Sequence, residues 1–192
     1  MKTLLTFARA VDQLNEICGR WFRWLILAVV LISAGNAIIR KAFHASSNGF
    51  LEIQWYLFGA IVLLCAGYTL KKNEHVRIDV IVGRLARRTQ AWIDIGGALL
   101  FLLPLCVLVA HDSWPQFIKA WTIHEVSPDA GGLVRWPVRL LIPLGFLLLG
   151  LQGVAIIIKN AAFLLGKIPF PYEDKTRTGE EEMVRGLKRE KQ

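Results

Sequence analysis

Few side chains in this sequence could bind an ion or transfer a proton. Two carboxylates, Glu52 and Asp94, stand inside apolar stretches of the chain. A carboxylate near the bilayer midplane would suit a coupling ion, and facing histidines inside membrane spans would suit haem. Both carboxylates stand near the ends of their stretches, however, and no histidine stands in the middle of one. The sequence therefore predicts neither a coupling site nor a haem site, and we expect no cofactor.

The run His75-x-Arg77-x-Asp79 contains two residue types that bind metals. Its arginine would repel a cation, and no second ligand cluster accompanies it, so we expect no metal site. The three cysteines include no CxxC pair, which argues against a disulfide framework or a thiol-redox enzyme. No nucleophile elbow, phosphate loop or HExxH motif is present. We therefore expect no catalytic residue, and a chain that neither catalyses nor transports anything alone.

Four apolar runs position these residues, over about 24–39, 50–70, 91–111 and 138–158. A helix of about 20 residues crosses the ~30 Å hydrocarbon core of a bilayer. Backbone polar groups cannot remain unpaired in lipid, so each run is expected to be a helix. Hydrophobic residues make up 54% of the chain, which is high for a soluble protein. The predicted fold class is an all-α integral membrane protein with four transmembrane helices.

The net charge of +8 is divided unevenly between the two sides of this arrangement. With four spans, both termini lie on the same side as the connection 71–90, and that side carries 18 of the 23 lysines and arginines. The positive-inside rule makes this side cytoplasmic. The charge is spread along a membrane face rather than gathered in a basic domain, so we do not expect nucleic-acid binding.

Polar and apolar residues recur at helical spacing before the first run, which predicts an amphipathic helix over about 3–22. We expect this helix to lie in the membrane interface, with Arg20 and Arg23 near lipid headgroups. The alternative is a simple extension of the first span into the cytoplasm. Residues 1–165 would form the membrane domain, and the densely charged residues 166–192 would form a solvated cytoplasmic tail.

The basic connection between the second and third spans is predicted to hold a short interfacial helix. Its apolar face would consist of Ile78, Ile81, Val82 and Leu85. Three of its arginines are expected to bind anionic lipid headgroups: Arg84, Arg87 and Arg88. Asp94 follows at the start of the third span, where we expect it to complement the helix dipole or to neighbour Arg87 or Arg88. This explanation is favoured over a functional role for Asp94.

Glu52 needs a partner, because a lone buried charge is costly. Arg40 or Lys41 across the short first loop is one candidate, and a residue of another subunit is the other.

Pro104 in the middle of the third span predicts a kink. In the fourth span, Gly145 offers a close-packing face and Gln152 a buried hydrogen-bonding group.

Residues 113–137 form the longest connection on the side opposite the termini. Four large side chains fall there at helical spacing and predict a separate short surface helix: Trp114, Phe117, Ile118 and Trp121. The segment SPDAGG that follows is a strong turn signal. The connection is thus expected to be a helix followed by a tight turn into the fourth span.

Two stretches match the pattern of a known family. The first has Glu52 early in the second span, then Gly59, and after that span the run His75-Val76-Arg77-Ile78-Asp79. The second runs from Glu125-Val126-Ser127 through Gly131-Gly132-Leu133 and Trp136-Pro137 to Ile142-Pro143-Leu144-Gly145. In the order and spacing of these motifs, the chain between about 21 and 165 resembles the small membrane subunit of TRAP (tripartite ATP-independent periplasmic) transporters, the DctQ-like family.

The resemblance implies a bacterial inner-membrane protein with two protein partners. One would be a large multi-span membrane subunit that moves the solute with sodium, and the other a periplasmic solute-binding protein that captures it. The small subunit would be a scaffold that braces the large one among the membrane lipids. Organic acids are the usual substrates of the family.

Ten residues are candidates for subunit contacts or structural ties. They are Glu52, Trp55, His75, Arg77, Asp79, Asp94, Trp121, Glu125, Trp136 and Gln152. The stretch 114–136 would form the outer surface near the binding protein. A second interpretation is a self-contained four-helix membrane enzyme or small pore, and a third is a lipid-bound structural protein without a transport role.

Overall fold

The computed structural model of the chain describes residues 1–43, 48–72, 85–129 and 131–171. Apart from one antiparallel bridge between Val126 and Val134, the regular structure in those ranges is helical. Four helical stretches are long and apolar enough to cross a membrane: Lys2–Phe43, Asn48–Lys72, Arg87–Thr122 and Trp136–Leu164. The predicted all-α fold with four transmembrane helices is confirmed.

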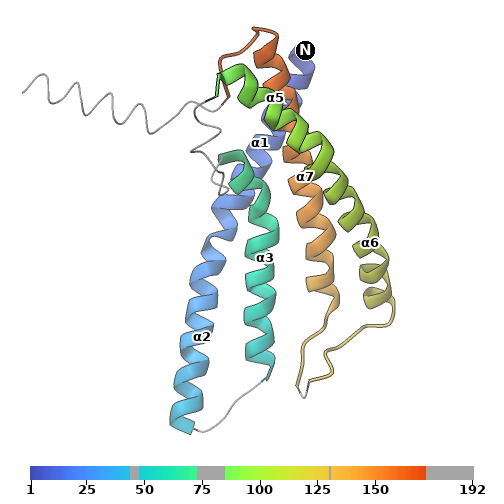
Figure 1. Ribbon diagram of the computed structural model, residues 1–192. Coiled ribbons are helices and arrows are strands. Elements are labelled where there is room, and N and C mark those ends of the chain that lie inside the picture. The colour runs from blue at the N-terminus through green and yellow to red at the C-terminus, as the bar shows by residue number, and fades with distance from the viewer. Residues whose placement is uncertain (44–47, 73–84, 130, 172–192) are drawn as a thin grey trace, which may run out of the picture.

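Helix α7 (Trp136–Leu164) lies at the centre of the bundle, and nine of its residues are buried. Its neighbours are α1 (Lys2–Phe22), α3 (Asn48–Lys72), α5 (Arg87–Gly97) and α6 (Leu103–Thr122). Helix α2 (Trp24–Phe43) packs mainly against α3 and buries none of its own residues, so it forms one edge of the bundle (Figure 1). The centre of the molecule is therefore the last span rather than the first.

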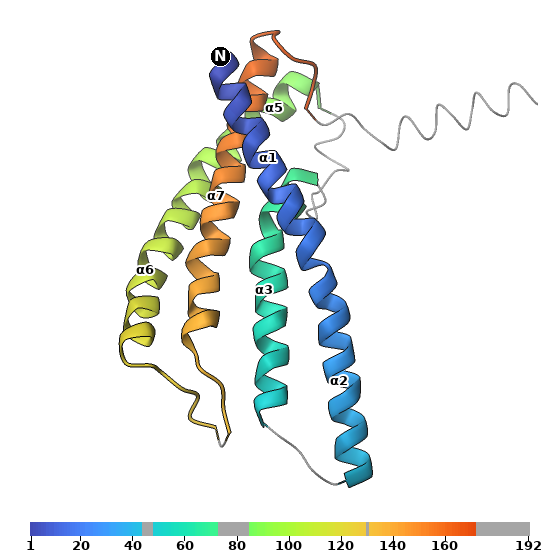
Figure 2. The ribbon, with the colours of Figure 1, turned by 180° about the vertical axis from the view of Figure 1, so that it is seen from behind.

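One end of the bundle carries the connection between α6 and α7. Residues 123–129 and 131–135 form a hairpin there, beside the start of α3, and α2 ends at the same end of the bundle (Figures 1 and 2). We call this the hairpin end. The first residues of α1, the start of α5 and the end of α7 lie at the opposite end (Figure 2).

The contact between α3 and α7 depends on a glycine. A Cβ atom placed on Gly145 would lie 2.8 Å from the backbone oxygen of Leu63, which is closer than real Cβ atoms approach. Small residues at this position let two helix backbones come together. The close-packing role predicted for Gly145 is thus confirmed, and α3 is its partner.

The amphipathic N-terminal helix is present as α1, and only Arg23 separates it from α2. Its predicted position in the membrane interface, and the alternative of an extended first span, both stay predictions. Its buried stripe consists of Ala8, Val11, Asn15 and Gly19, and it packs against α3 and α7. Small residues allow this approach: a Cβ on Gly19 would overlap the Tyr68 ring. The larger apolar side chains, such as Leu4 and Trp21, are exposed instead.

The predicted separate surface helix over residues 114–121 is wrong, because these residues continue α6. The third helical stretch runs from Arg87 to Thr122 through a π-helical turn, Ala98–Leu102. Pro104 follows this turn directly, at the start of α6. Proline lacks the amide hydrogen that an α-helix interior needs, and a π-helical turn is one way to accommodate that loss. Pro104 therefore lies beside a local irregularity of the helix, and the kink itself stays a prediction.

Candidate functional site

The hairpin is held to α3 by Glu52. The Leu133 amide donates a hydrogen bond of 2.6 Å to Glu52 Oε2, and the Ser127 hydroxyl donates to Glu52 Oε1. Within the hairpin, the Ser127 amide donates to the Leu133 carbonyl at 2.9 Å, and the Gly132 amide donates to the Asp129 carbonyl at 2.9 Å. One carboxylate thus bonds both strands of the hairpin where they pass α3.

This arrangement corrects the partner that we expected for Glu52. Neither Arg40 nor Lys41 pairs with it, and its partners belong to the same chain rather than to another subunit. A backbone amide and a hydroxyl satisfy the carboxylate directly, as buried polar groups require. The resemblance-based motif Glu125-Val126-Ser127 contained one of these donors, but the sequence did not show that it faces Glu52.

Glu125, at the start of the hairpin, ties it to α7. Arg139 Nη2 donates to Glu125 Oε1 at 2.6 Å, and Arg135 Nη1 lies 3.6 Å from the same oxygen. The Arg135 amide also donates to the Glu125 carbonyl at 2.8 Å. The Glu125 side chain is only 19% exposed, so this ion pair is shielded more than an ordinary surface pair.

Aromatic side chains add an apolar tie beside this ion pair. The rings of Trp121, at the end of α6, and Trp136, at the start of α7, meet edge to face with centroids 4.6 Å apart. Phe117 extends the contact to Trp121, and Trp114 extends it to Phe117. Edge-to-face pairs of this kind stabilise by about 0.5–1.5 kcal/mol beyond their buried area. Trp121 and Trp136, both predicted as site residues, therefore join α6 to α7.

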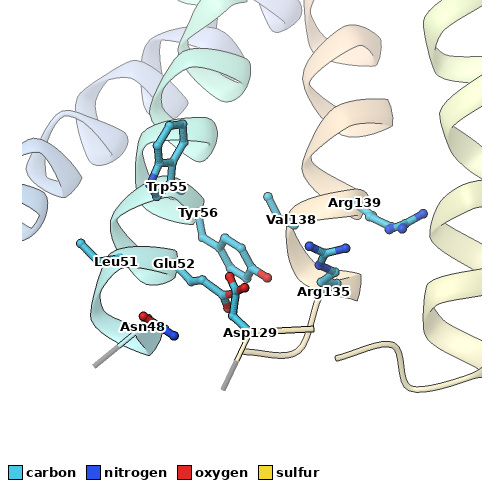
Figure 3. Close-up of a pocket in the computed structure, with 9 residues that line it drawn as sticks. All are labelled: Asn48, Leu51, Glu52, Trp55, Tyr56, Asp129, Arg135, Val138 and Arg139. Carbon is cyan, nitrogen blue, oxygen red and sulfur yellow. The ribbon is translucent and has the colours of Figure 1, made fainter. Parts of the chain in front are cut away.

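A cavity of about 520 Å³ opens beside these ties, between α3, the hairpin and α7. Figure 3 shows Glu52, Tyr56 and Asp129 close together, with Arg135 and Arg139 on the α7 side. Trp55 lines the cavity as well, and its side chain is 75% exposed. Glu52, Arg135 and Arg139 already bond to groups of the chain itself, so the cavity presents mixed and largely neutralised charge.

A second polar cluster, which we call the inner network, joins α1 to α7 nearer the opposite end. Asn15 Nδ2 donates to Gln152 Oε1 at 2.8 Å, and Gln152 Nε2 donates to Asp12 Oδ1 at 3.0 Å. Lys159 Nζ donates to Asp12 Oδ1 at 2.6 Å. Asn15 and Gln152 are fully buried, which confirms Gln152 as a buried hydrogen-bonding group. The network fixes the register of α1 on α7.

A further ion pair joins α1 to α3. Lys71 Nζ lies 2.6 Å from Glu16 Oε2, and Lys72 Nζ lies 3.8 Å from the same oxygen. Asp12, Asn15 and Glu16 were not among the predicted site residues. Asn15 and Glu16 stand three and four residues after Asp12, so all three lie on one face of the helix. This shared polar face is the sequence feature that could have predicted their contacts with other helices.

The remaining predicted residues do not join either cluster. Asp94 is half-buried in α5, and Arg20, Arg23 and Arg88 are exposed. Arg87, also exposed, lies over the Phe170 ring at 5.7 Å. Four other predicted residues lie outside the described ranges, as does the predicted interfacial helix: His75, Arg77, Asp79 and Arg84. Within the described ranges, no group of three or more His, Cys, Asp or Glu residues could hold a metal ion.

Comparisons with known proteins identify a family and a relative that resemble this chain. The model of the DctQ family, described as "Tripartite ATP-independent periplasmic transporters, DctQ component", matches residues 29–163, which is well over half of the chain. The chain is also similar to a Haemophilus influenzae protein assigned as a TRAP transporter small permease protein, with 28% identity over 96 residues. That match covers 50% of this chain and 58% of the relative, less than two thirds of its length. No solved structure matches.

Replacing Glu52 by alanine should loosen the hairpin. The change removes the acceptor of the Leu133 amide and of the Ser127 hydroxyl. A hydrogen bond to a charged group is worth about 1.5–3 kcal/mol, so the Leu133 amide should exchange its hydrogen roughly ten- to a hundred-fold faster. Hydrogen exchange of the purified chain in detergent measures this. Asp112→Ala, which removes an exposed carboxylate in the middle of α6, is the control, and equal exchange at Leu133 in both variants would contradict the assignment.

The inner network should behave as one unit. Asn15→Ala and Gln152→Ala each remove one end of the 2.8 Å hydrogen bond, so together they should cost less than the sum of the two single changes. A coupling of about 0.5–3 kcal/mol in the free energy of unfolding is expected for contacting residues. Thr6→Ala combined with Gln152→Ala is the control pair, because Thr6 is exposed and bonds only to the Lys2 carbonyl in the described chain. Additive effects in the first pair would refute the coupling.

Proposed function

We propose that this chain, which belongs to the DctQ component family of tripartite ATP-independent periplasmic (TRAP) transporters, braces the large membrane subunit of such a transporter. Family membership makes it a transport component with several membrane spans rather than a member of a known enzyme class. The bracing role goes further than membership. It rests on one observation: Glu52, Gln152 and Lys71 each bond to a different part of the bundle and hold its helices to one another.

Each described tie joins two parts of the same bundle. Glu52 joins α3 to the hairpin, Gln152 joins α7 to α1, and Lys71 joins α3 to α1. A transport site would instead need polar groups near the middle of the spans that remain free to bind a solute or an ion. Groups committed to internal hydrogen bonds suit a frame that keeps its shape while a neighbouring subunit moves.

The outward faces of the frame are apolar. Exposed large side chains occur along α2 and α6, including Leu27, Leu31, Ile38, Leu105 and Leu108. Exposed faces of this kind suit lipid or another membrane-spanning subunit. This supports a lateral contact with a large multi-span subunit, with lipids covering the remaining surface.

The assembly would have the sidedness and partners that the charge pattern and the family suggest. The hairpin end faces the periplasm and the solute-binding protein, and both termini lie in the cytoplasm, within a bacterial inner membrane. The large subunit would couple import of organic acids or related solutes to sodium. The cytoplasmic sidedness is supported by the excess of lysine and arginine near the termini and in the connection 71–90.

Co-purification tests the bracing role. The tagged chain should recover the large subunit in a constant ratio from membranes in which both are expressed, after extraction with a mild detergent. An unrelated multi-span protein expressed at the same level is the control and should not be recovered. Recovery of the chain alone would overturn the proposal. Solute flux or conductance from the chain reconstituted alone would favour the small pore instead.

A further inference from the structure

A second cavity of about 520 Å³ lies between α2 and α3 near the hairpin end. We call it the α2–α3 cleft. Its polar lining consists of Ser33, Asn36, Arg40, Lys41 and Gln54. Ser33, Asn36 and Arg40 come from α2 at spacings of three and four, so they form one stripe along that helix, and Lys41 follows Arg40 directly. Gln54 faces them from α3.

The cleft is rich in hydrogen-bond donors and carries positive charge. Every polar side chain in its lining can donate a hydrogen bond, two of them are cations, and no described carboxylate lines it. Glu52, the acid nearest in the sequence, is bonded to the hairpin instead. No ion pair of Arg40 or Lys41 occurs among the residues that the structure places. The cavity of Figure 3 differs, because its arginines have Glu125 as a partner.

Gln54 supplies a separate indication that something binds in the cleft. Its side-chain nitrogen is buried and has no hydrogen-bond partner in the described part of the chain. A buried donor without an acceptor costs about 1–3 kcal/mol, so such groups normally have a partner. An oxygen of an anionic ligand would satisfy this donor and neutralise Arg40 and Lys41 at the same time.

The surface next to the cleft is apolar on both helices. One turn from Ser33 along α2 stands Val30, which is 56% exposed, and one turn from Gln54 along α3 stands Phe58, which is 60% exposed. Ile26 and Val62 continue the two rows and are also exposed. The cleft is polar and cationic at the ends of the two helices, and an apolar strip follows toward their middles. This arrangement is complementary to a phospholipid, whose charged headgroup lies above its acyl chains.

We propose that the α2–α3 cleft binds the phosphate group of an anionic phospholipid. Arg40 and Lys41 attract the phosphate, Gln54 and Asn36 donate hydrogen bonds to its oxygens, and the acyl chains lie along Val30 and Phe58. The site is independent of the bracing role, because it needs only that α2 and α3 cross a membrane. It also accounts for two cations at a helix end where the described part of the chain pairs them with no acid.

Lipid binding to the purified, delipidated full chain tests the proposal. Native mass spectrometry should show dioleoylphosphatidylglycerol bound in preference to dioleoylphosphatidylcholine. Arg40→Gln should weaken the phosphatidylglycerol complex roughly ten-fold, as expected for loss of a hydrogen bond to a charged group. Lys119→Gln is the matched control, with the same charge change on an exposed residue near the hairpin end, and should have no effect. Equal losses in the two variants, or none in either, would overturn the site.

Two further arms separate the lipid from other sources of negative charge. Gln54→Leu leaves the net charge unchanged and removes the buried donor, so it should also weaken phosphatidylglycerol binding, and unchanged binding would count against the cleft. Inorganic phosphate in millimolar excess should not displace the lipid, since it lacks acyl chains, and full displacement would indicate a free anion site. If the co-purified large subunit displaces the lipid, the cations belong to a protein contact and the proposal fails. Unfolding curves of all variants verify that the bundle is intact.

Discussion

Glu52 is a carboxylate in an apolar helix, and it must find hydrogen-bond donors inside the protein. The hairpin supplies them through the Leu133 amide and the Ser127 hydroxyl. Because the hairpin leads from α6 into α7, this contact fixes the α6–α7 pair against α3. The Glu125–Arg139 ion pair holds the hairpin to α7, and the Trp121–Trp136 contact holds the end of α6 to the start of α7. The carboxylate of Glu52, which is half-buried, is thus one of the ties that determine the shape of the hairpin end.

The inner network holds α1 to α7, as Glu52 holds the hairpin to α3. Gln152 accepts from Asn15 and donates to Asp12, so α7 is tied to α1 while α3 is tied to α1 through Lys71. The bundle is therefore held by polar ties toward both ends, with apolar packing such as Gly145 on Leu63 between them. The family match begins at residue 29, so α1 and its part of the network lie before it.

The spans were predictable from the sequence because hydrophobicity over about 20 residues is a local property. The buried hydrogen bonding of Gln152 was also predictable, since an amide inside an apolar span needs a hydrogen-bond partner. The partner of Glu52 was not, because it depends on where residues 127–133 lie in space. The packing face of α1 was not predicted, because it includes small residues such as Ala8 and Gly19, which hydrophobicity alone does not single out.

The central claim, that this chain is a frame of constant shape, is tested most directly by a distance across the bundle. Spin labels at Arg20 and Asp112, both exposed, would report the separation of α1 from the middle of α6 in the assembled transporter, after the three native cysteines are changed to alanine. The account predicts one narrow distance distribution that stays the same when sodium and solute-loaded binding protein are added. A shifted distance or a second population would contradict it.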